Sequence, residues 1–218
     1  MPPRGRKLLI AVKESAGAGG SVLSLPIGQP IEAVLRPVAT RIEGLRAEDV
    51  RVLTEWRNRH VRAFLTEFQA KEWRTRRWLT ETVGPDDSRI LFMVDAADGR
   101  TVGYVGLAFI DWEERSAEAD AVVRGVGALP GIMTKALHTL LEWARGQLGL
   151  DSLGVRVRSD NPALAFYRTF GFREVTRVPL RAVEEADMLR WTEDRSMPSG
   201  EPSLVHMALP KGGSSGAP

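Results

Sequence analysis

Two segments of the sequence combine residue types and spacings that could carry out chemistry. The first, residues 122–137, reads VVRGVGALPGIMTKAL and places several glycines just before the start of a predicted helix. Glycine-rich backbone and the positive end of a helix dipole can together hold a phosphate-sized anion. The dinucleotide fingerprint does not fit, because Pro130 stands where its third glycine belongs, and no Gly-Lys-Ser/Thr follows as a phosphate loop requires. A plain Gly/Pro connection is the alternative on spacing alone.

The second segment, residues 159–172, reads SDNPALAFYRTFGF. Asn161 takes the N-cap position of a short helix, Pro162 its first turn and Gly171 its end. Tyr167 lies on this helix, where a half-buried packing tyrosine is the simplest interpretation. A predicted strand separates the two segments, and this pairing favours a shared functional site.

Hydrophobic periodicity predicts the elements that position both segments. Helices are expected over residues 47–58, 70–82, 131–149 and 162–170. Strands are expected over residues 90–94, 102–110, 117–124, 153–157, 173–180 and 204–209. This order of helices and strands predicts a mixed sheet of the α/β class.

Composition sets the domain organisation and excludes several kinds of site. The 218 residues are 43% hydrophobic and 27% charged and include no cysteine, which excludes disulfides, thiolate metal sites and a cysteine nucleophile. Glycine, serine and proline concentrate near both ends of the chain. We therefore expect a partly flexible N-terminal extension at 1–35, one domain at 36–210 and a flexible tail at 211–218.

Charge and hydropathy narrow the range of partners. The formal net charge is only +2, a mild excess rather than a nucleic-acid-binding stripe. No apolar run approaches the roughly 20 residues that cross a bilayer. The apolar stretch at 8–12 is too short for a signal peptide. The expectation is a cytoplasmic protein that binds neither nucleic acid nor membranes.

Three segments in this order resemble the GNAT acetyltransferase superfamily: GLRAEDVRVLTEWRN at 44–58, ALPGIMTKAL at 128–137 and DNPALAFYRTFGF at 160–172. The resemblance covers about residues 38–180, and it is similar in particular to the branch of ribosomal-protein alanine acetyltransferases and nucleotide-amino-sugar acetyltransferases. It implies an α/β (α+β) fold with a mixed, mostly antiparallel central sheet flanked by helices. It also implies acetyl-CoA as the donor, no metal, and direct attack by a primary amine without a covalent enzyme intermediate.

The resemblance also implies a donor site. Val122 and Val123 would pair with the pantetheine arm, and Tyr167 would protonate the departing thiolate. The expected pyrophosphate-binding residues are Ala128, Leu129, Gly131, Ile132, Met133 and Thr134. Ala128 and Met133 depart from the family pattern, which has Gln or Arg and a second glycine there. Asn161 precedes Tyr167 by six positions instead of the usual seven, so either Asp160 or Asn161 would contact pantetheine.

A base must deprotonate the acceptor, because an alkylammonium cannot attack a thioester. The candidates are Glu118 and Asp120 on the strand beside the donor, with Glu113 behind them; solvated strand carboxylates are the alternative.

The expected acceptor-binding residues are Arg57, Asn58, Arg62 and Trp112, although the arginines could equally lie on a solvated helix face. Arginine suits an anionic acceptor, so a nucleotide-linked amino sugar is the preferred small-molecule amine. The alternatives are a protein N-terminus and a CoA-binding module without turnover; a homodimer is a further possibility.

Overall fold

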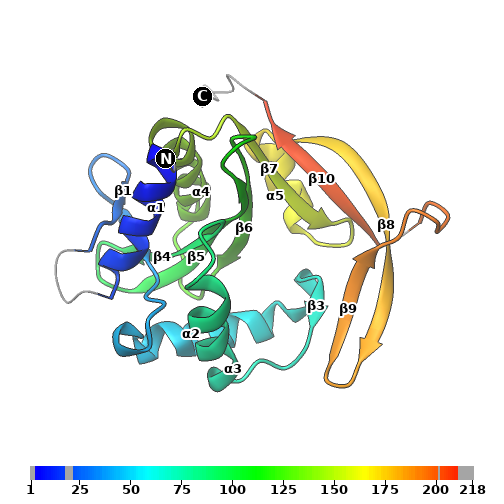
Figure 1. Cartoon of the computed structure of the whole chain (residues 1–218), viewed down its shortest axis with the longest axis horizontal. Helices are drawn as coiled ribbons and strands as arrows, with labels where there is room; N and C mark the ends of the chain where they lie inside the picture. The colour runs from blue at the N-terminus through cyan, green and yellow to red at the C-terminus, as the bar shows by residue number, and fades with distance from the viewer. Residues whose placement is uncertain (1–2, 18–21, 201, 211–218) are drawn as a thin grey trace.

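A ten-stranded sheet forms the frame of the protein over the residues that the computed structural model describes, 3–17, 22–200 and 202–210 (Figure 1). Its strands, in spatial order, are β1 (Leu25–Ile27), β2 (Ala33–Pro37), β4 (Ile90–Ala96), β5 (Thr101–Asp111), β6 (Ser116–Arg124), β7 (Ser152–Arg158), β10 (Ser203–Leu209), β8 (Arg173–Glu185), β9 (Met188–Glu193) and β3 (Thr66–Glu67). All neighbours pair antiparallel except β6 and β7, which are parallel. The predicted mixed, mostly antiparallel sheet is confirmed.

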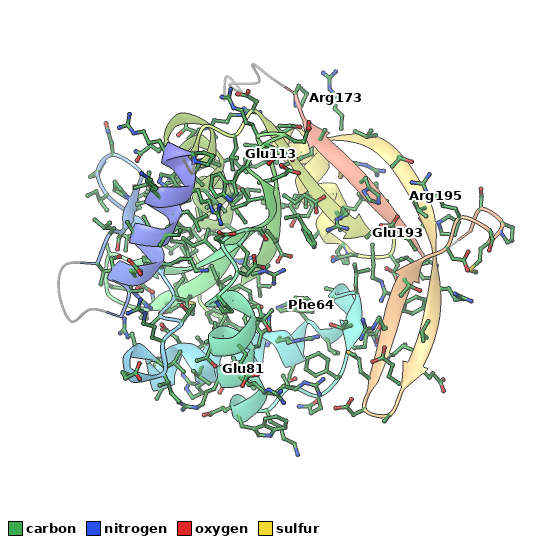
Figure 2. The ribbon with its side chains drawn as sticks, viewed as in Figure 1. Phe64, Glu81, Glu113, Arg173, Glu193 and Arg195 are labelled. Carbon is green, nitrogen blue, oxygen red and sulfur yellow. The ribbon has the colours of Figure 1, made fainter. Side chains whose placement is uncertain are left out.

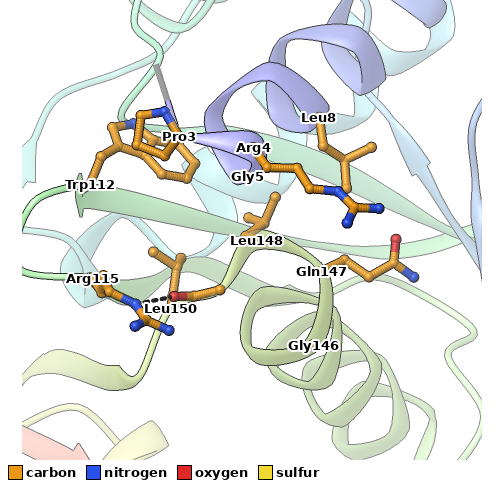
Figure 3. A pocket seen from close by; sticks show the side chains of 11 residues that line it. Pro3, Arg4, Gly5, Leu8, Trp112, Arg115, Gly146, Gln147, Leu148 and Leu150 are labelled. Atoms are coloured by element: carbon orange, nitrogen blue, oxygen red, sulfur yellow. Dashed lines mark hydrogen bonds between the residues drawn. The ribbon is translucent and has the colours of Figure 1, made fainter. Parts of the chain in front are cut away.

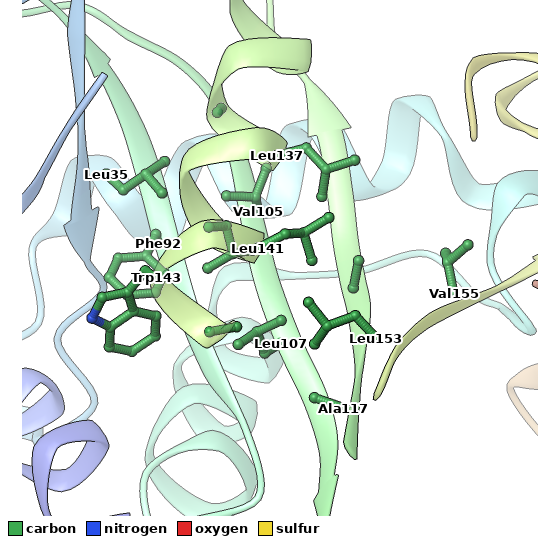
Figure 4. Close-up of a cluster of buried hydrophobic side chains, with 14 of the residues drawn as sticks. Leu35, Phe92, Val105, Leu107, Ala117, Leu137, Leu141, Trp143, Leu153 and Val155 are labelled. Carbon is green, nitrogen blue, oxygen red and sulfur yellow. The ribbon is translucent and has the colours of Figure 1, made fainter. Parts of the chain in front are cut away.

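Helices cover both faces of this sheet. One face carries α1 (Arg4–Ser15), α4 (Ile132–Trp143) and α5 (Ala163–Phe170), whose apolar side chains share a core with the strands (Figure 4). The other face carries α2 (Ala47–Arg59), α3 (Glu72–Arg77) and the helical turn at 78–83. Because both faces are covered, β4 reads as a continuous apolar run: Phe92 packs into the first core and Met93 into the second, both 0% exposed.

The N-terminal segment is more ordered than its composition indicated. Helix α1 buries Leu9 and Val12 in the main core, and Lys13 Nζ donates hydrogen bonds of 2.6 and 2.7 Å to the carbonyls of Val83 and Asp86. Strands β1 and β2 then extend the sheet beside β4. The boundary drawn at residues 35/36 therefore falls inside β2. The predicted tail at 211–218 lies outside the described residues.

The β8–β9 hairpin also exceeds the prediction, which ended the strand at residue 180. Strand β8 continues to Glu185, turns back into β9, and β9 pairs with the two-residue strand β3 (Figure 1). Most residues of the extended part are exposed, so no apolar alternation marks it in the sequence. The hairpin brings the segment that follows α2 beside the sheet.

Among the helices of the described residues, none combines the length and the apolar character that crossing a membrane requires.

Candidate active site

The main candidate site is a cavity at the point where β6 and β7 separate. The two strands pair from Ser116 opposite Ser152 to Ala119 opposite Val155, and no further. Beyond that point β6 carries a bulge, because two of its residues fall between successive partners on β5 and Ala121 has a φ of 52°. A cavity of about 710 Å³ occupies the fork and is lined by residues 118–124 and 156–158, among others.

Seven of the predicted site residues line this cavity. They are Glu118, Asp120, Val122, Val123, Met133, Asn161 and Tyr167. They come from β6, α4, α5 and the turn before α5, so segments about 50 residues apart in sequence converge on one space.

The predicted phosphate-binding loop leads from β6 into α4. Gly127 and Gly131 adopt φ values of 73° and 78°, which favour glycine and let the loop turn sharply into the helix. Ala128 is buried and Leu129 exposed. The first N–H groups of a helix lack intrahelical partners, so the start of α4 at Ile132 offers donors to an anion. Met133, the departure from the family pattern, packs against Gly103, where a Cβ would lie 2.6 Å from its sulfur.

The turn before α5 distinguishes the two candidates for the pantetheine contact. Asp160 is held by Arg158 through two hydrogen bonds of 2.9 and 2.7 Å. Asn161 lines the cavity, accepts a hydrogen bond from the Ala163 N–H at 2.9 Å and donates to the Ala63 carbonyl at 3.3 Å. The geometry therefore favours Asn161 over Asp160 at this position.

A phenol and a carboxylate, those of Tyr167 and Asp120, line the same cavity. Tyr167 is 6% exposed, and its ring lies edge-on to Phe166 and Phe172. Burial, and then the Asp120 charge, raise the pKa of Tyr167 above its usual range, so the phenol stays protonated at neutral pH. Asp120 keeps accessible surface where it lines the cavity, yet the surrounding protein raises its carboxyl pKa, with Arg89 and Arg156 opposing.

Glu118, the other candidate base, is already engaged. Its Oε2 accepts a hydrogen bond of 2.6 Å from Arg156 Nε, and the Arg156 guanidinium lies 4.1 Å from the ring centre of Phe109. Phe109 is 54% exposed and has a φ of 52°, which is rare for so large a side chain. Glu113 lies in the turn between β5 and β6, away from the cavity residue Phe64 (Figure 2). Of the three carboxylates expected as bases, Asp120 is the one that lines the cavity and forms no ion pair among the described residues.

Arg57 and Asn58 position the segment after α2. Arg57 Nη2 donates hydrogen bonds to the backbone and side-chain oxygens of Thr66 at 2.6 and 3.0 Å. The Asn58 amide bonds both the N–H and the carbonyl of Ala70. Neither side chain lines the cavity, and Arg62 is exposed outside it. The structure thus does not assemble the expected arginine clamp.

Trp112 is also outside the site. Its indole N–H donates to the Asp87 carbonyl at 3.2 Å, and its ring lines a separate cavity of about 440 Å³ between α1 and residues 146–150, which follow α4 (Figure 3). The physical reason is its position beyond the end of β5, next to the stretch where β6 and β7 are still paired. The fork lies toward the opposite end of β6.

The sequence did not predict a buried ionic cluster around Arg158 at one wall of the cavity. Arg158 is 5% exposed, donates to Glu67 at 2.8 Å and lies 4.4 Å from the ring centre of Trp191. The Trp191 indole N–H donates to the same Glu67 oxygen at 2.7 Å. This cluster joins β3, β7 and β9, so it fixes the segment after α2 against the fork.

His60 is a second cavity-lining residue that the sequence did not single out. Within the described residues its Nε2 is buried without a hydrogen-bond partner. Burial and the Arg59 charge lower the pKa of the imidazole, so the ring is neutral at pH 7. No residue spacing around His60 gave a signal for this placement.

Comparison with known proteins gives the family. Residues 40–173 match the family described as "Acetyltransferase (GNAT) domain". The chain belongs to the GNAT acetyltransferase family. GNAT acetyltransferases take the acetyl group from acetyl-CoA, so the protein is an acetyl-CoA-dependent N-acetyltransferase, as the sequence predicted. No curated protein sequence matches the chain.

Solved structures share the GNAT fold. A spermidine/spermine N-acetyltransferase, SpeG from Vibrio cholerae, determined with manganese ions, has a TM-score of 0.57 and 18% identity over 82% of this chain and 92% of its own. The Vibrio cholerae spermidine N-acetyltransferase in complex with CoA and spermine has a TM-score of 0.59 and 20% identity over 76% of this chain and 91% of its own. At this identity the likeness shows the fold alone.

The GNAT donor can be tested against the residues present. Beyond Ala119, the edge of β6 that faces β7 is not paired with β7. Its main-chain groups can therefore hydrogen-bond an extended pantetheine arm in the manner of an added strand. The α4 start and its glycine loop suit the phosphates. The cavity that holds Tyr167 and Asp120 reaches this part of the chain at Arg124 and Met133. The residues therefore fit acetyl-CoA. The described residues contain no cluster of three or more His, Asp or Glu side chains arranged to hold a metal ion.

Proposed function

We propose that this GNAT enzyme acetylates a small, positively charged primary amine, with Asp120 as the base and Tyr167 as the acid. The observation that supports the assignment most directly is that both side chains line one cavity at the fork of β6 and β7. Homodimer formation and a cytoplasmic location remain predictions from the sequence.

The charges around the acceptor end of the cavity favour a cation. Arg156 is paired with Glu118, and Arg158 is paired with both Glu67 and Asp160. Among the described residues, no cation lies within ion-pair distance of Asp120. An incoming ammonium group can therefore form an ion pair with Asp120, whereas an anionic acceptor would meet a like charge there.

The nucleotide-linked amino sugar expected from the sequence loses its supporting residues. It relied on arginines over the acceptor site, but Arg57 and Arg62 lie outside the cavity. The three arginines of α3, Arg74, Arg76 and Arg77, pair with Asp187, Glu72 and Glu81. Arg57 bonds Thr66 and stacks on the ring of Phe68 at 4.0 Å. We therefore place a compact cationic amine, such as a polyamine, ahead of a nucleotide sugar and of a protein N-terminus.

The proposed acetyl transfer proceeds in three steps. Asp120 accepts a proton from the bound ammonium, directly or through one water, and leaves a free amine. The amine nitrogen then forms a bond to the thioester carbonyl carbon, and the carbon–sulfur bond breaks when the tetrahedral adduct collapses. Tyr167 donates its proton to the departing sulfur, since its raised pKa keeps it protonated. The adduct nitrogen loses its second proton to the Tyr167 phenolate as it becomes the amide nitrogen, and Asp120 releases its proton to solvent, so both residues regain their starting states.

An acceptor screen tests the proposal. Acetyl-CoA consumption is measured with polyamines, amino sugars, nucleoside-diphosphate amino sugars and peptides with free N-termini, and each product is confirmed by mass spectrometry. The proposal predicts the highest kcat/KM among the polyamines and simple cationic amines. Preferred acetylation of a nucleotide sugar or of a peptide would refute the acceptor class and leave the acetyltransferase chemistry intact.

A further inference from the structure

Three arginines line the cavity, and only one of them lacks a carboxylate partner among the described residues. Arg156 pairs with Glu118 at 2.6 Å, and Arg158 pairs with Glu67 and Asp160. Arg124, at the end of β6, has no carboxylate within 4 Å in the described part of the chain. It stands at the donor end of the cavity, four residues beyond Asp120 on the same strand.

The loop that Arg124 leads into has no charged side chain of its own. It reads Gly-Val-Gly-Ala-Leu-Pro-Gly over residues 125–131. Two cations beside this loop are paired with carboxylates. Lys135 pairs with Glu32 at 2.5 Å, and Arg100, whose Nη1 lies 3.1 Å from the position of a Cβ on Gly127, pairs with Asp98 at 2.8 Å.

Arg124 is held against this loop by a hydrogen bond. Its Nη2 donates to the carbonyl oxygen of Ala128 at 2.9 Å. Ala128 is the residue where the family pattern places Gln or Arg, so the Arg124 guanidinium reaches the same point of the loop from four residues earlier. A guanidinium has further N–H donors, which suit the parallel oxygens of a phosphate.

We propose that Arg124 binds the pyrophosphate of acetyl-CoA and replaces the basic or amide side chain that the loop lacks at Ala128. This inference rests on the proposed function, because it assumes that acetyl-CoA occupies the fork. The helix start at Ile132 supplies N–H donors to the same phosphates. The Arg124 charge and the α4 dipole would therefore both stabilise the same anion.

The test compares donors that carry or lack the phosphates. Arg124→Met removes the charge and keeps an unbranched side chain of similar reach, and Arg124→Lys restores the charge without the guanidinium geometry. Arg173→Met is the matched control, because Arg173 is also exposed and pairs with no described carboxylate, and it lies at the far end of β8 (Figure 2). KM and kcat are measured with acetyl-CoA, acetyl-3′-dephospho-CoA and S-acetylpantetheine.

A lost charge-assisted hydrogen bond predicts that Arg124→Met raises KM about 10- to 100-fold for both pyrophosphate donors. Its kcat should stay within about twofold of wild type, and Arg124→Lys should recover part of the loss. With S-acetylpantetheine, Arg124→Met and wild type should have equal kcat/KM, which also shows that the variant folds. Arg173→Met should match wild type with all three donors.

Three results would overturn the inference. An unchanged KM for acetyl-CoA in Arg124→Met would show that backbone donors suffice. An equal loss with S-acetylpantetheine would show that Arg124 only shapes the loop. A loss confined to the donor with the 3′-phosphate would assign Arg124 to a different phosphate. A wild-type protein that neither binds CoA in calorimetry nor consumes acetyl-CoA would refute the proposed function itself.

Discussion

Replacing Asp120 by Asn gives the sharpest test of the base, because the expected loss depends on pH in a calculable way. Without a base, only acceptor molecules that are already uncharged can react. An alkylamine with a pKa of about 10.4 is uncharged in roughly one molecule in 2,500 at pH 7. If Asp120 deprotonates the bound ammonium, wild type exceeds Asp120→Asn by up to ~2,500-fold at pH 7, ~250-fold at pH 8 and ~25-fold at pH 9.

The assay is a pH–rate profile of kcat/KM with saturating acetyl-CoA, in buffers of constant ionic strength. Burial raises the pKa of Asp120, so the acidic limb of the wild-type profile should lie above the ordinary range of an aspartate. Glu118→Gln is the matched control, two residues away on the same strand and tied to Arg156. Its loss should be small and constant with pH, since it changes acceptor contacts and not proton transfer.

A constant ratio of wild type to Asp120→Asn between pH 7 and 9 would refute this reasoning. The reasoning would also be refuted if the ratio of wild-type to variant kcat/KM fell tenfold per pH unit for Glu118→Gln and stayed constant for Asp120→Asn. In that case the Arg156–Glu118 pair opens when the acceptor binds, and Glu118 takes the proton.

Three further predictions concern the acid and the N-terminal helix. Tyr167→Phe should keep the melting temperature of wild type while turnover falls about 100-fold, because only the proton donor is lost. Gly5→Ala would place a Cβ 2.0 Å from the carbonyl oxygen of Leu148, so unfolding experiments should show destabilisation of about 1–3 kcal/mol, whereas Gly146→Ala, with open space around its Cβ, should unfold like wild type. Burial lowers the pKa of Lys13 to about 8 from 10.5. The unfolded chain therefore binds more protons between these values, and the unfolding free energy attributable to Lys13 should rise with pH across that window; the rise should be missing in denaturant titrations of Lys13→Met.

The sequence predicted the elements whose signal is local. The helix expected at 47–58 is α2 at 47–59, and the strand expected at 90–94 is β4 at 90–96, because a continuous apolar run or a helical stripe is visible in one stretch of chain. The long helix expected to close at Gly149 does so, with Gly149 at a φ of 74°. Tyr167 was singled out because it lies in the 160–172 segment that carries the resemblance, and Asp120 because it is a carboxylate on the strand beside the expected donor. The structure places both at one cavity, and their roles stay predictions.

The sequence could not predict features that depend on distant partners. Arg158 and Glu67 are 91 residues apart in the sequence. No local sequence pattern around either residue indicates that the two form an ion pair. Helix α1 was missed because RGRKLLIAVKES mixes basic residues with a short apolar stretch, and its order depends on packing against the main core. The expected clamp failed for the same reason: the sequence does not reveal that Arg57 hydrogen-bonds Thr66, or that Arg57 and Arg62 both lie outside the cavity.

The bulge at Ala121 has a consequence for how this sheet could change. A strand with one residue fewer at that point would keep its alternation past Ala119 and could stay paired with β7 along its whole length. The main-chain groups that now border the cavity would then be used up within the sheet, and the fork would close. A single-residue deletion on β6 should therefore turn this acetyltransferase into a complete but inert sheet. Substrate access therefore depends on β6 and β7 remaining unpaired beyond Ala119.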